Sequence, residues 1–170
     1  MSNIIKSQII ISDEIKELVA GIESPATSDT LIEIRNRMYS RLETRPYNQS
    51  TREHEKTIRW KRTSAEIIKD GYVYTGKACT DQVILFMALC EAFHLTTRFV
   101  KLKKYNEVHS VAEIKLEDGW YIFDVSRKGS VPEKGEATKE NTYHGWQLWQ
   151  KGRDAWDLGL VDFDSIEKMY

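Results

Sequence analysis

With 170 residues, 41% of them hydrophobic and 30% charged, the chain can bury a sizeable core and has the composition of a soluble globular protein. Its 25 basic and 26 acidic residues give a net charge of -1, so no positive excess attracts nucleic acid or an anionic membrane. The apolar stretch 1–12 is too short to span a bilayer, is interrupted by Lys6 and has no small-residue cleavage site. We expect a terminal strand or helical turn there, and a cytoplasmic protein.

Residues 1–70 are expected to form a helical layer. Helical spacing of apolar residues, or a run of charged residues, marks three segments of it: 13–22, 30–44 and 51–61. Thr30 with Glu33, and Thr63 with Glu66, have the spacing of a capping box, which indicates that a helix starts at each threonine.

The next part of the chain, 71–126, changes from helix to strand. Gly71 ends the preceding helix, and residues 72–78 read as a connector. The stretch 83–95 is almost wholly apolar, which is typical of a helix buried on every side. β-rich runs then predict three strands: 96–105, 109–116 and 120–126. Asp118-Gly119 between the last two is a hairpin signal.

Two segments complete the chain. Residues 127–141 are polar and are expected to form an exposed or partly mobile loop. The tail 142–170 is rich in tryptophan and is expected to pack back on the body as helix and loop. The fold class that follows is α+β, with a helical N-terminal region and a central buried helix packed on a small antiparallel sheet.

The chain has two cysteines, Cys79 and Cys90. On one helix they would lie about 16 Å apart, at roughly 1.5 Å per residue. A disulfide requires Cα atoms within about 7 Å of each other. Two reduced thiols agree with a cytoplasmic location.

Three polar residues stand at the ends of the central elements. Cys79 begins the buried helix, His109 begins the second strand, and Asp124 lies near the end of the third. A helix N-terminus and an adjacent imidazolium both stabilise a thiolate, which is the reactive form of cysteine. A carboxylate orients the imidazole, and the free N–H groups of a helix start can bind an oxyanion. The order of these residues predicts a cysteine nucleophile.

The hairpin between the last two strands supports this grouping in part. A two-residue turn at Asp118-Gly119 would place Asp124 opposite Glu113, on the same face as His109. Along the strand, Asp124 and His109 would be offset by four residues, about 13 Å. A bulge, strong twist or longer turn must close that distance.

The sequence GKACTDQVILFMALCEAFHLTTRFVKL, followed by HSVAEIKLEDGWYIFDVS, resembles the core of the transglutaminase-like superfamily of papain-like cysteine enzymes. The resemblance covers about 71–126. It implies that Cys79 is the nucleophile, His109 the base and Asp124 the orienting acid, in a transglutaminase- and papain-like fold. The sequence departs from the family in having Gly76 three residues before the cysteine, Val-Ser after the aspartate, and Val111 in place of a frequent aromatic residue.

Two further kinds of site are conceivable from the sequence, an oxyanion hole and a metal site. An oxyanion hole needs a second donor beside the Cys79 N–H. The upstream candidates are Tyr72, Tyr74 and Trp60, of which we retain two, Tyr74 and Trp60. The spacing of Cys90 and His94 suits a metal, but no further ligands follow, so we expect a buried thiol and a helix end.

Packing or solvent-facing roles are expected for most of the remaining polar and aromatic candidates. For His54 we expect a surface or packing role, and for Glu113 a solvated strand position or an ion pair with a lysine or arginine. Asp81 is expected to favour the helix dipole. Three tryptophans are expected in the core, with a substrate groove as the alternative: Trp146, Trp149 and Trp156. His144 is expected at the surface, with some chance of lining the site.

The predicted function is amide hydrolysis through a thioester on Cys79, with a peptide or protein as substrate and no metal or organic cofactor. Two alternatives stay open: transfer of the acyl group to an amine, as in a transglutaminase, and a non-catalytic peptide-binding domain. The chain is read as one domain, 1–170. Its expected parts are a helical layer at 1–70, a catalytic core at 71–126 and a packing tail at 142–170.

Overall fold

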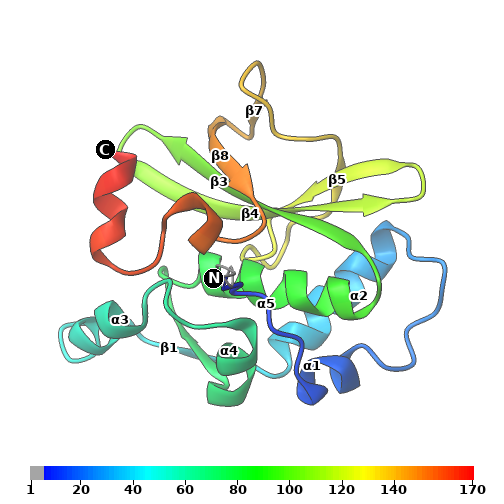
Figure 1. Cartoon of the computed structure of the whole chain (residues 1–170), viewed down its shortest axis with the longest axis horizontal. Helices are drawn as coiled ribbons and strands as arrows, with labels where there is room; N and C mark the ends of the chain where they lie inside the picture. The colour runs from blue at the N-terminus through cyan, green and yellow to red at the C-terminus, as the bar shows by residue number, and fades with distance from the viewer. Residues whose placement is uncertain (1–5) are drawn as a thin grey trace, which may run out of the picture.

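The computed structural model describes residues 6–170 and shows a sheet on one side of the molecule and helices on the other (Figure 1). The helices are α1 (Asp13–Leu18), α2 (Ser28–Tyr39), α3 (Arg52–Ile58), α4 (Ser64–Asp70) and α5 (Cys79–Ala92). Two 3-10 helices, η1 (Trp156–Leu158) and η2 (Asp164–Met169), lie near the C-terminus. None of the helices in the described part is both long and apolar enough to cross a membrane.

The sheet is antiparallel and has six strands in the order β6-β5-β4-β3-β8-β7. Its strands are β3 (Thr96–Lys104), β4 (Glu107–Leu116), β5 (Gly119–Phe123), β6 (Glu133–Lys134), β7 (Thr142–Tyr143) and β8 (Trp146–Gly152). A separate two-stranded parallel pair joins β1 (Glu43–Arg45) to β2 (Tyr72–Tyr74). The expected α+β fold, with helices packed on an antiparallel sheet, is confirmed.

The central helix α5 is buried along most of its length, as its apolar sequence predicts. It packs against β3 and β4 on one side and against α1, α2 and α4 on the other. The side chains from Val83 to Cys90 are all fully buried. A helix enclosed in this way has no solvent-facing side, which explains the absence of polar residues at helical spacing.

Some of the N-terminal helices have other boundaries than the sequence predicts. The capping box at Thr63 is present, but that of α2 joins Thr27 to Thr30 rather than Thr30 to Glu33. The hydroxyl of Thr30 accepts a hydrogen bond from the N–H of Thr27 at 2.9 Å, so the helix starts earlier. The prediction also missed β1 and β2, because each is only three residues long.

The hairpin between β4 and β5 has a different register from the one predicted. Leu116 pairs with Gly119, so the turn residues are Glu117 and Asp118. Gly119 adopts a φ of 131°, which favours glycine and lets this residue open the strand rather than sit in the turn. Consequently Glu113 pairs with Ile122 and not with the position of Asp124.

The prediction of helix and loop for the tail is wrong in its first half. Residues 146–152 form β8, which pairs with β3 inside the sheet. Exposed and less exposed side chains alternate from Trp146 to Leu148, and β3 offers its free edge to this segment. Residues 156–169 do form short helical turns, η1 and η2. The predicted loop 127–141 contains the short strand β6, which pairs with β5.

Glu113 is not a solvated strand residue. Its side chain is fully buried and accepts hydrogen bonds from Lys151 Nζ at 3.0 Å and from the N–H of Ala137 at 2.7 Å. The other expectation for this residue, an ion pair with a lysine or arginine, is therefore confirmed. The contact ties the 127–141 segment to the centre of the sheet.

Candidate active site

Cys79 is the first residue of α5 and lies in a cleft of about 450 Å³. The thiol is partly exposed. No side chain caps this end of α5, which leaves the first N–H groups of the helix available to a ligand. The cleft is lined by residues of several elements, among them Arg59, Trp60, Lys77, Lys101, Glu107, His109, Trp146 and Tyr170.

His109 and Asp124 are in direct contact. Nε2 of His109 lies 2.9 Å from Oδ2 of Asp124, and both side chains are largely buried. The register explains this approach. The last pair of the β4–β5 ladder is Ala112 with Phe123, so one further step along both segments brings Asp124 to the level of Val111. Val111 is two residues from His109, so the offset is about 6.6 Å instead of the 13 Å of the predicted register.

Cys79 and His109 line the same cleft, and each of the two groups shifts the pKa of the other. Because Nε2 contacts Asp124, Nδ1 is the ring nitrogen left for the sulfur. Burial opposes ionisation of Cys79. The hydrogen bond to His109 and the charges of Lys101 and His109 outweigh it and lower the pKa of Cys79 to about 6.

The imidazole responds in the opposite direction. Burial alone would lower the pKa of His109, but the hydrogen bonds to Asp124 and Cys79 raise it to about 9. Between about pH 6 and pH 9 the pair is therefore a thiolate and an imidazolium. This is the state in which a cysteine nucleophile and its proton donor are both ready.

Asp124 is held from its other side by serines. Ser126 Oγ donates to Oδ1 of Asp124 at 3.0 Å, and Ser130 Oγ donates to its backbone carbonyl. Burial favours the neutral acid, but the hydrogen bond from His109 prevails and keeps the pKa of Asp124 below its usual value. The carboxylate is thus charged and fixed in orientation.

The two upstream oxyanion candidates lie in different places. Trp60 lines the cleft beside Cys79, and its carbonyl is fixed by hydrogen bonds from Gln8 and Trp156. Tyr74 lines a small neighbouring cavity with Asp81 and contacts the ring of Tyr72. Of these two candidates, Trp60 is the one that shares the cleft with Cys79.

A second cavity of about 540 Å³ continues from the far side of His109 and Asp124. His109 and Trp146 line both cavities, and the ring centroids of these two residues are 5.3 Å apart. His144 lines the second cavity and contacts Glu133 at 2.8 Å. The interpretation that gave His144 a chance of lining the site agrees with this placement.

Lys101 is a cleft residue that the sequence analysis did not single out. Its side chain is only 1% exposed, although it stands in a strand with three other cationic residues, all more exposed. Nζ donates to Ser110 Oγ at 2.9 Å and to Thr80 Oγ1 at 3.3 Å. The alternation of side chains along a strand could have indicated its burial, because Lys101 lies on the same face as the buried Phe99.

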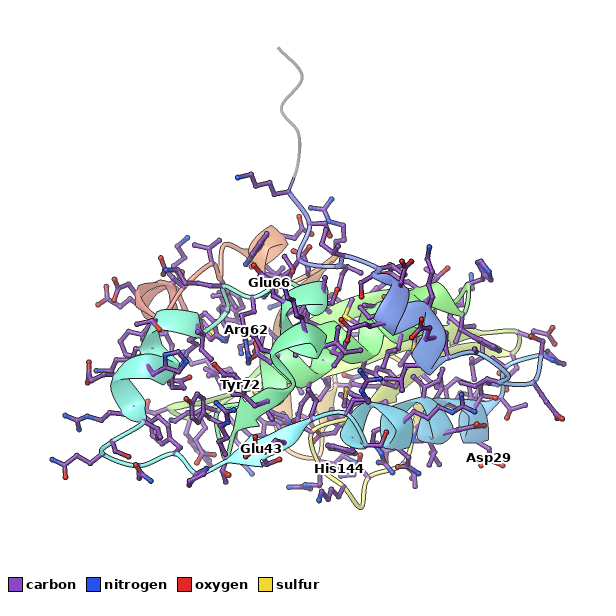
Figure 2. The ribbon with its side chains drawn as sticks, turned by 90° about the horizontal axis from the view of Figure 1, so that it is seen from below. Asp29, Glu43, Arg62, Glu66, Tyr72 and His144 are labelled. Carbon is purple, nitrogen blue, oxygen red and sulfur yellow. The ribbon has the colours of Figure 1, made fainter. Side chains whose placement is uncertain are left out.

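The other polar candidates, Asp81, His54 and Cys90, contact residues outside the Cys79 cleft or are buried in the core. Asp81 does not face solvent; it pairs with Arg62 at 2.6 Å, and burial raises its pKa. Figure 2 shows Arg62 and Tyr72 close together in the helical layer, and the guanidinium lies 5.0 Å from the ring centroid. His54 is exposed and contacts the hydroxyl of Tyr72. Cys90 is fully buried, which raises the pKa of its thiol far above the ordinary value.

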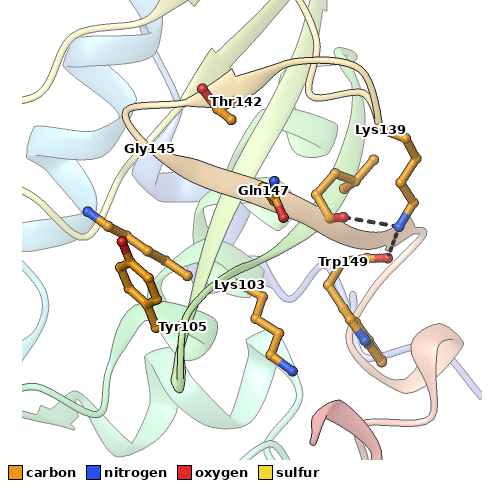
Figure 3. Close-up of a pocket in the computed structure, with 9 residues that line it drawn as sticks. Lys103, Tyr105, Lys139, Thr142, Gly145, Gln147 and Trp149 are labelled. Atoms are coloured by element: carbon orange, nitrogen blue, oxygen red, sulfur yellow. Dashed lines mark hydrogen bonds between the residues drawn. The ribbon is translucent and has the colours of Figure 1, made fainter.

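A further groove of about 510 Å³ lies on another part of the sheet (Figure 3). Lysines and aromatic residues line it, including Lys103, Lys104, Tyr105, Lys139 and Trp149. Lys139 is engaged by the carbonyls of Leu148 and Trp149. This groove has no cysteine or histidine in its lining, so it lacks the groups of the Cys79 cleft.

Comparison with known proteins bears on the fold. No family model and no curated protein matches the chain. A solved structure does. It is described as a "putative cysteine protease" from Cytophaga hutchinsonii, and it matches 91% of this chain with a TM-score of 0.59 and 20% sequence identity. The chain spans 47% of that protein, about half of its length. The likeness shows a shared fold of helices packed on an antiparallel sheet.

Proposed function

We propose that the chain is a cysteine hydrolase of the transglutaminase-like type, which cleaves an amide through a thioester on Cys79. The observation that carries the proposal is that Cys79, at the start of a buried helix, shares its cleft with His109, which is bonded to Asp124. The fold shared with the Cytophaga hutchinsonii protein is compatible with it. Each residue then has a defined step to perform.

Acylation begins with the thiolate of Cys79. The sulfur forms a bond to the carbonyl carbon of the substrate amide, and the carbonyl oxygen becomes an oxyanion. The N–H of Cys79 and the indole N–H of Trp60 are the donors proposed to bind it. The imidazolium of His109 then gives its Nδ1 proton to the amine nitrogen, the C–N bond breaks, and a thioester remains.

Deacylation uses the same groups in reverse. Neutral His109 takes a proton from a water molecule as the water oxygen attacks the thioester carbon. The C–S bond breaks, and the sulfur leaves as the thiolate beside the imidazolium. Asp124 keeps the imidazole ring in place and stabilises its charge through both halves of the cycle.

The cleft geometry favours an extended substrate such as a peptide or protein segment. His109 and Trp146 line both the cavity at Cys79 and the cavity at Asp124, so a bound segment that extends past His109 would use both. A small amide would fill only one of them. Binding on both sides of the scissile bond orients it for attack.

Casein digestion by the wild-type chain and by Cys79→Ala tests hydrolysis. A fluorescent amine added with a glutamine-rich protein tests transfer of the acyl group to an amine instead of water. Turnover in either assay that disappears in Cys79→Ala supports cysteine acyl chemistry, and the ratio between the assays assigns the acceptor. Peptide capture that survives Cys79→Ala, without turnover in the wild type, would assign a binding domain.

A further inference from the structure

Lys101 is a buried cation without a carboxylate partner. Its side chain is 1% exposed, and among residues 6–170 no aspartate or glutamate lies within 4.0 Å of its Nζ. Burying an ammonium away from water costs free energy unless an anion or strong acceptors compensate for it. The surroundings of Lys101 must therefore explain why a lysine occupies this position.

The contacts of Nζ lead towards the thiol. Nζ donates to Ser110 Oγ at 2.9 Å and to Thr80 Oγ1 at 3.3 Å, and these hydroxyls lie 2.8 Å apart. Cys79 precedes Thr80 in the chain and lines the same cleft as Lys101, and hydrogen bonding by Ser110 is among the influences that lower the pKa of Cys79. A hydroxyl oxygen has two lone pairs and one proton. Ser110 can accept from Lys101 and Thr80 and donate its proton to the sulfur.

We propose that Lys101 is a positioning residue that keeps Cys79 ionised, as the buried counter-ion of the thiolate and through the hydroxyl of Ser110. This inference rests on the proposed function. It adds a second cation to the pair of Cys79 and His109, approaching from β3. Trp60 closes the other side of Lys101, with Nζ 4.8 Å from the ring centroid.

Other charged groups around the cleft are already engaged or lie on its rim. Arg59 is held by both carboxylate oxygens of Glu55 at 2.6 Å. Lys77 stacks on Tyr47 at 5.0 Å, and Glu107 is exposed at the start of β4. Among the other described residues that line this cleft, His109 is paired with Asp124. Lys101 is the buried cation whose charge remains for the sulfur.

Ionisation of the two groups is mutual. Burial lowers the pKa of Lys101, and the charge of Cys79 acts in the opposite direction. The charge of Lys101 in turn helps to lower the pKa of Cys79. An opposite charge at about 4–6 Å shifts a pKa by roughly 1–3 units. Removal of Lys101 should therefore raise the pH at which the Cys79 thiolate forms.

The test is the rate of iodoacetamide alkylation of Cys79 as a function of pH, mapped by mass spectrometry. In the wild type we expect the midpoint near pH 6. In Lys101→Met we expect it to rise by about 1–2 units, so the rate at pH 5 falls about 10- to 100-fold. Lys104→Met, the same substitution on the same strand but in the groove of Figure 3, should leave the midpoint unchanged.

Three results separate the possible failures. A wild-type midpoint near that of an ordinary thiol, about pH 8.5, would remove the proposed function itself. A wild-type midpoint near 6 with the same midpoint in Lys101→Met would overturn only the role of Lys101. A purely structural lysine would lower reactivity at every pH without moving the midpoint, and this too would overturn it.

Folding of the variant is checked by urea unfolding. Because an apolar side chain removes the cost of the buried charge, we expect the unfolding midpoint of Lys101→Met to equal or exceed that of the wild type. If that variant does not fold, Ser110→Ala decides the question. Loss of the hydroxyl should raise the Cys79 midpoint by at least about 0.5 unit, and an unmoved midpoint would contradict the proposal.

Discussion

Nε2 of His109 lies 2.9 Å from Oδ2 of Asp124, although 15 positions of chain and a hairpin separate the two residues. The β4–β5 register produces this contact by placing the end of β5 near the start of β4. The contact holds the ring so that its other nitrogen faces Cys79. The first prediction concerns this hydrogen bond.

Replacing Asp124 by asparagine should lower the alkaline limit of activity. The hydrogen bond to Asp124 is the first of the influences that raise the pKa of His109 to about 9. Without the charge, His109 loses its proton at lower pH, and the imidazolium needed to protonate the leaving amine disappears. We expect kcat to fall at least about 10-fold at pH 8, with the alkaline limb of the pH profile moved downwards. Ser126→Ala, which removes only a hydroxyl contact to Asp124, should change kcat much less.

Protein stability should depend on pH through His109. Its folded-state pKa of about 9 lies above the unfolded value of about 6.5. The stabilisation is therefore fully present below pH 6.5 and is lost as the pH rises through 9. Cys79→Ala serves as the background, because the thiol, with its lowered pKa, gains stabilisation over nearly the same pH range and would mask the effect. The difference in unfolding free energy between Cys79→Ala and the double variant Cys79→Ala/His109→Ala, measured by urea titration, should shrink by about 1 kcal/mol or more from pH 6.5 to pH 10. An unchanged difference over that range would contradict the ion pair.

Trp60→Phe should separate oxyanion binding from thiol ionisation. Phenylalanine keeps a ring against Lys101 but has no N–H for the oxyanion. We expect kcat to fall roughly 10- to 1000-fold, since loss of one oxyanion donor costs about this much, while the alkylation midpoint of Cys79 stays near pH 6. If kcat stays at the wild-type value, the second donor must be another group. Tyr74→Phe is the matched control, and it should have little effect because Tyr74 lines a separate cavity.

Glu113→Leu should destabilise the fold without direct effect on the thiol. The substitution leaves the N–H of Ala137 without its acceptor and removes the closer of the two carboxylates of Lys151, since Glu136 lies at 3.6 Å. We expect a loss of about 3–5 kcal/mol in unfolding free energy. Lys115→Leu, an exposed position on the same strand, should stay within about 0.5 kcal/mol. Urea unfolding at pH 7 measures both, and equal stabilities would show that the buried contact contributes nothing net.

The order of elements and the identity of the reacting groups could be read from the sequence. An apolar run as long as 83–95 predicts a buried helix. Cys79 stands out because it lies just before this run, at the start of that helix. Strand periodicity located β3, β4 and β5, and the hairpin placed His109 and Asp124 at strand ends. These features depend on local chemistry and on the period of the side chains.

Only the tertiary structure shows the strand register, the strand pairing of the tail and the burial of charged side chains. A shift of one residue at Gly119 turned a separation of 13 Å into a hydrogen bond, because register is set by turn geometry as well as by pattern. The segment 146–152 became a strand because β3 had an unpaired edge beside it. Lys101 in β3 and Glu113 in β4 look like surface residues in the sequence. In the structure both are buried, and Glu113 is paired with Lys151. Burial of a charge depends on distant partners, which local sequence does not encode.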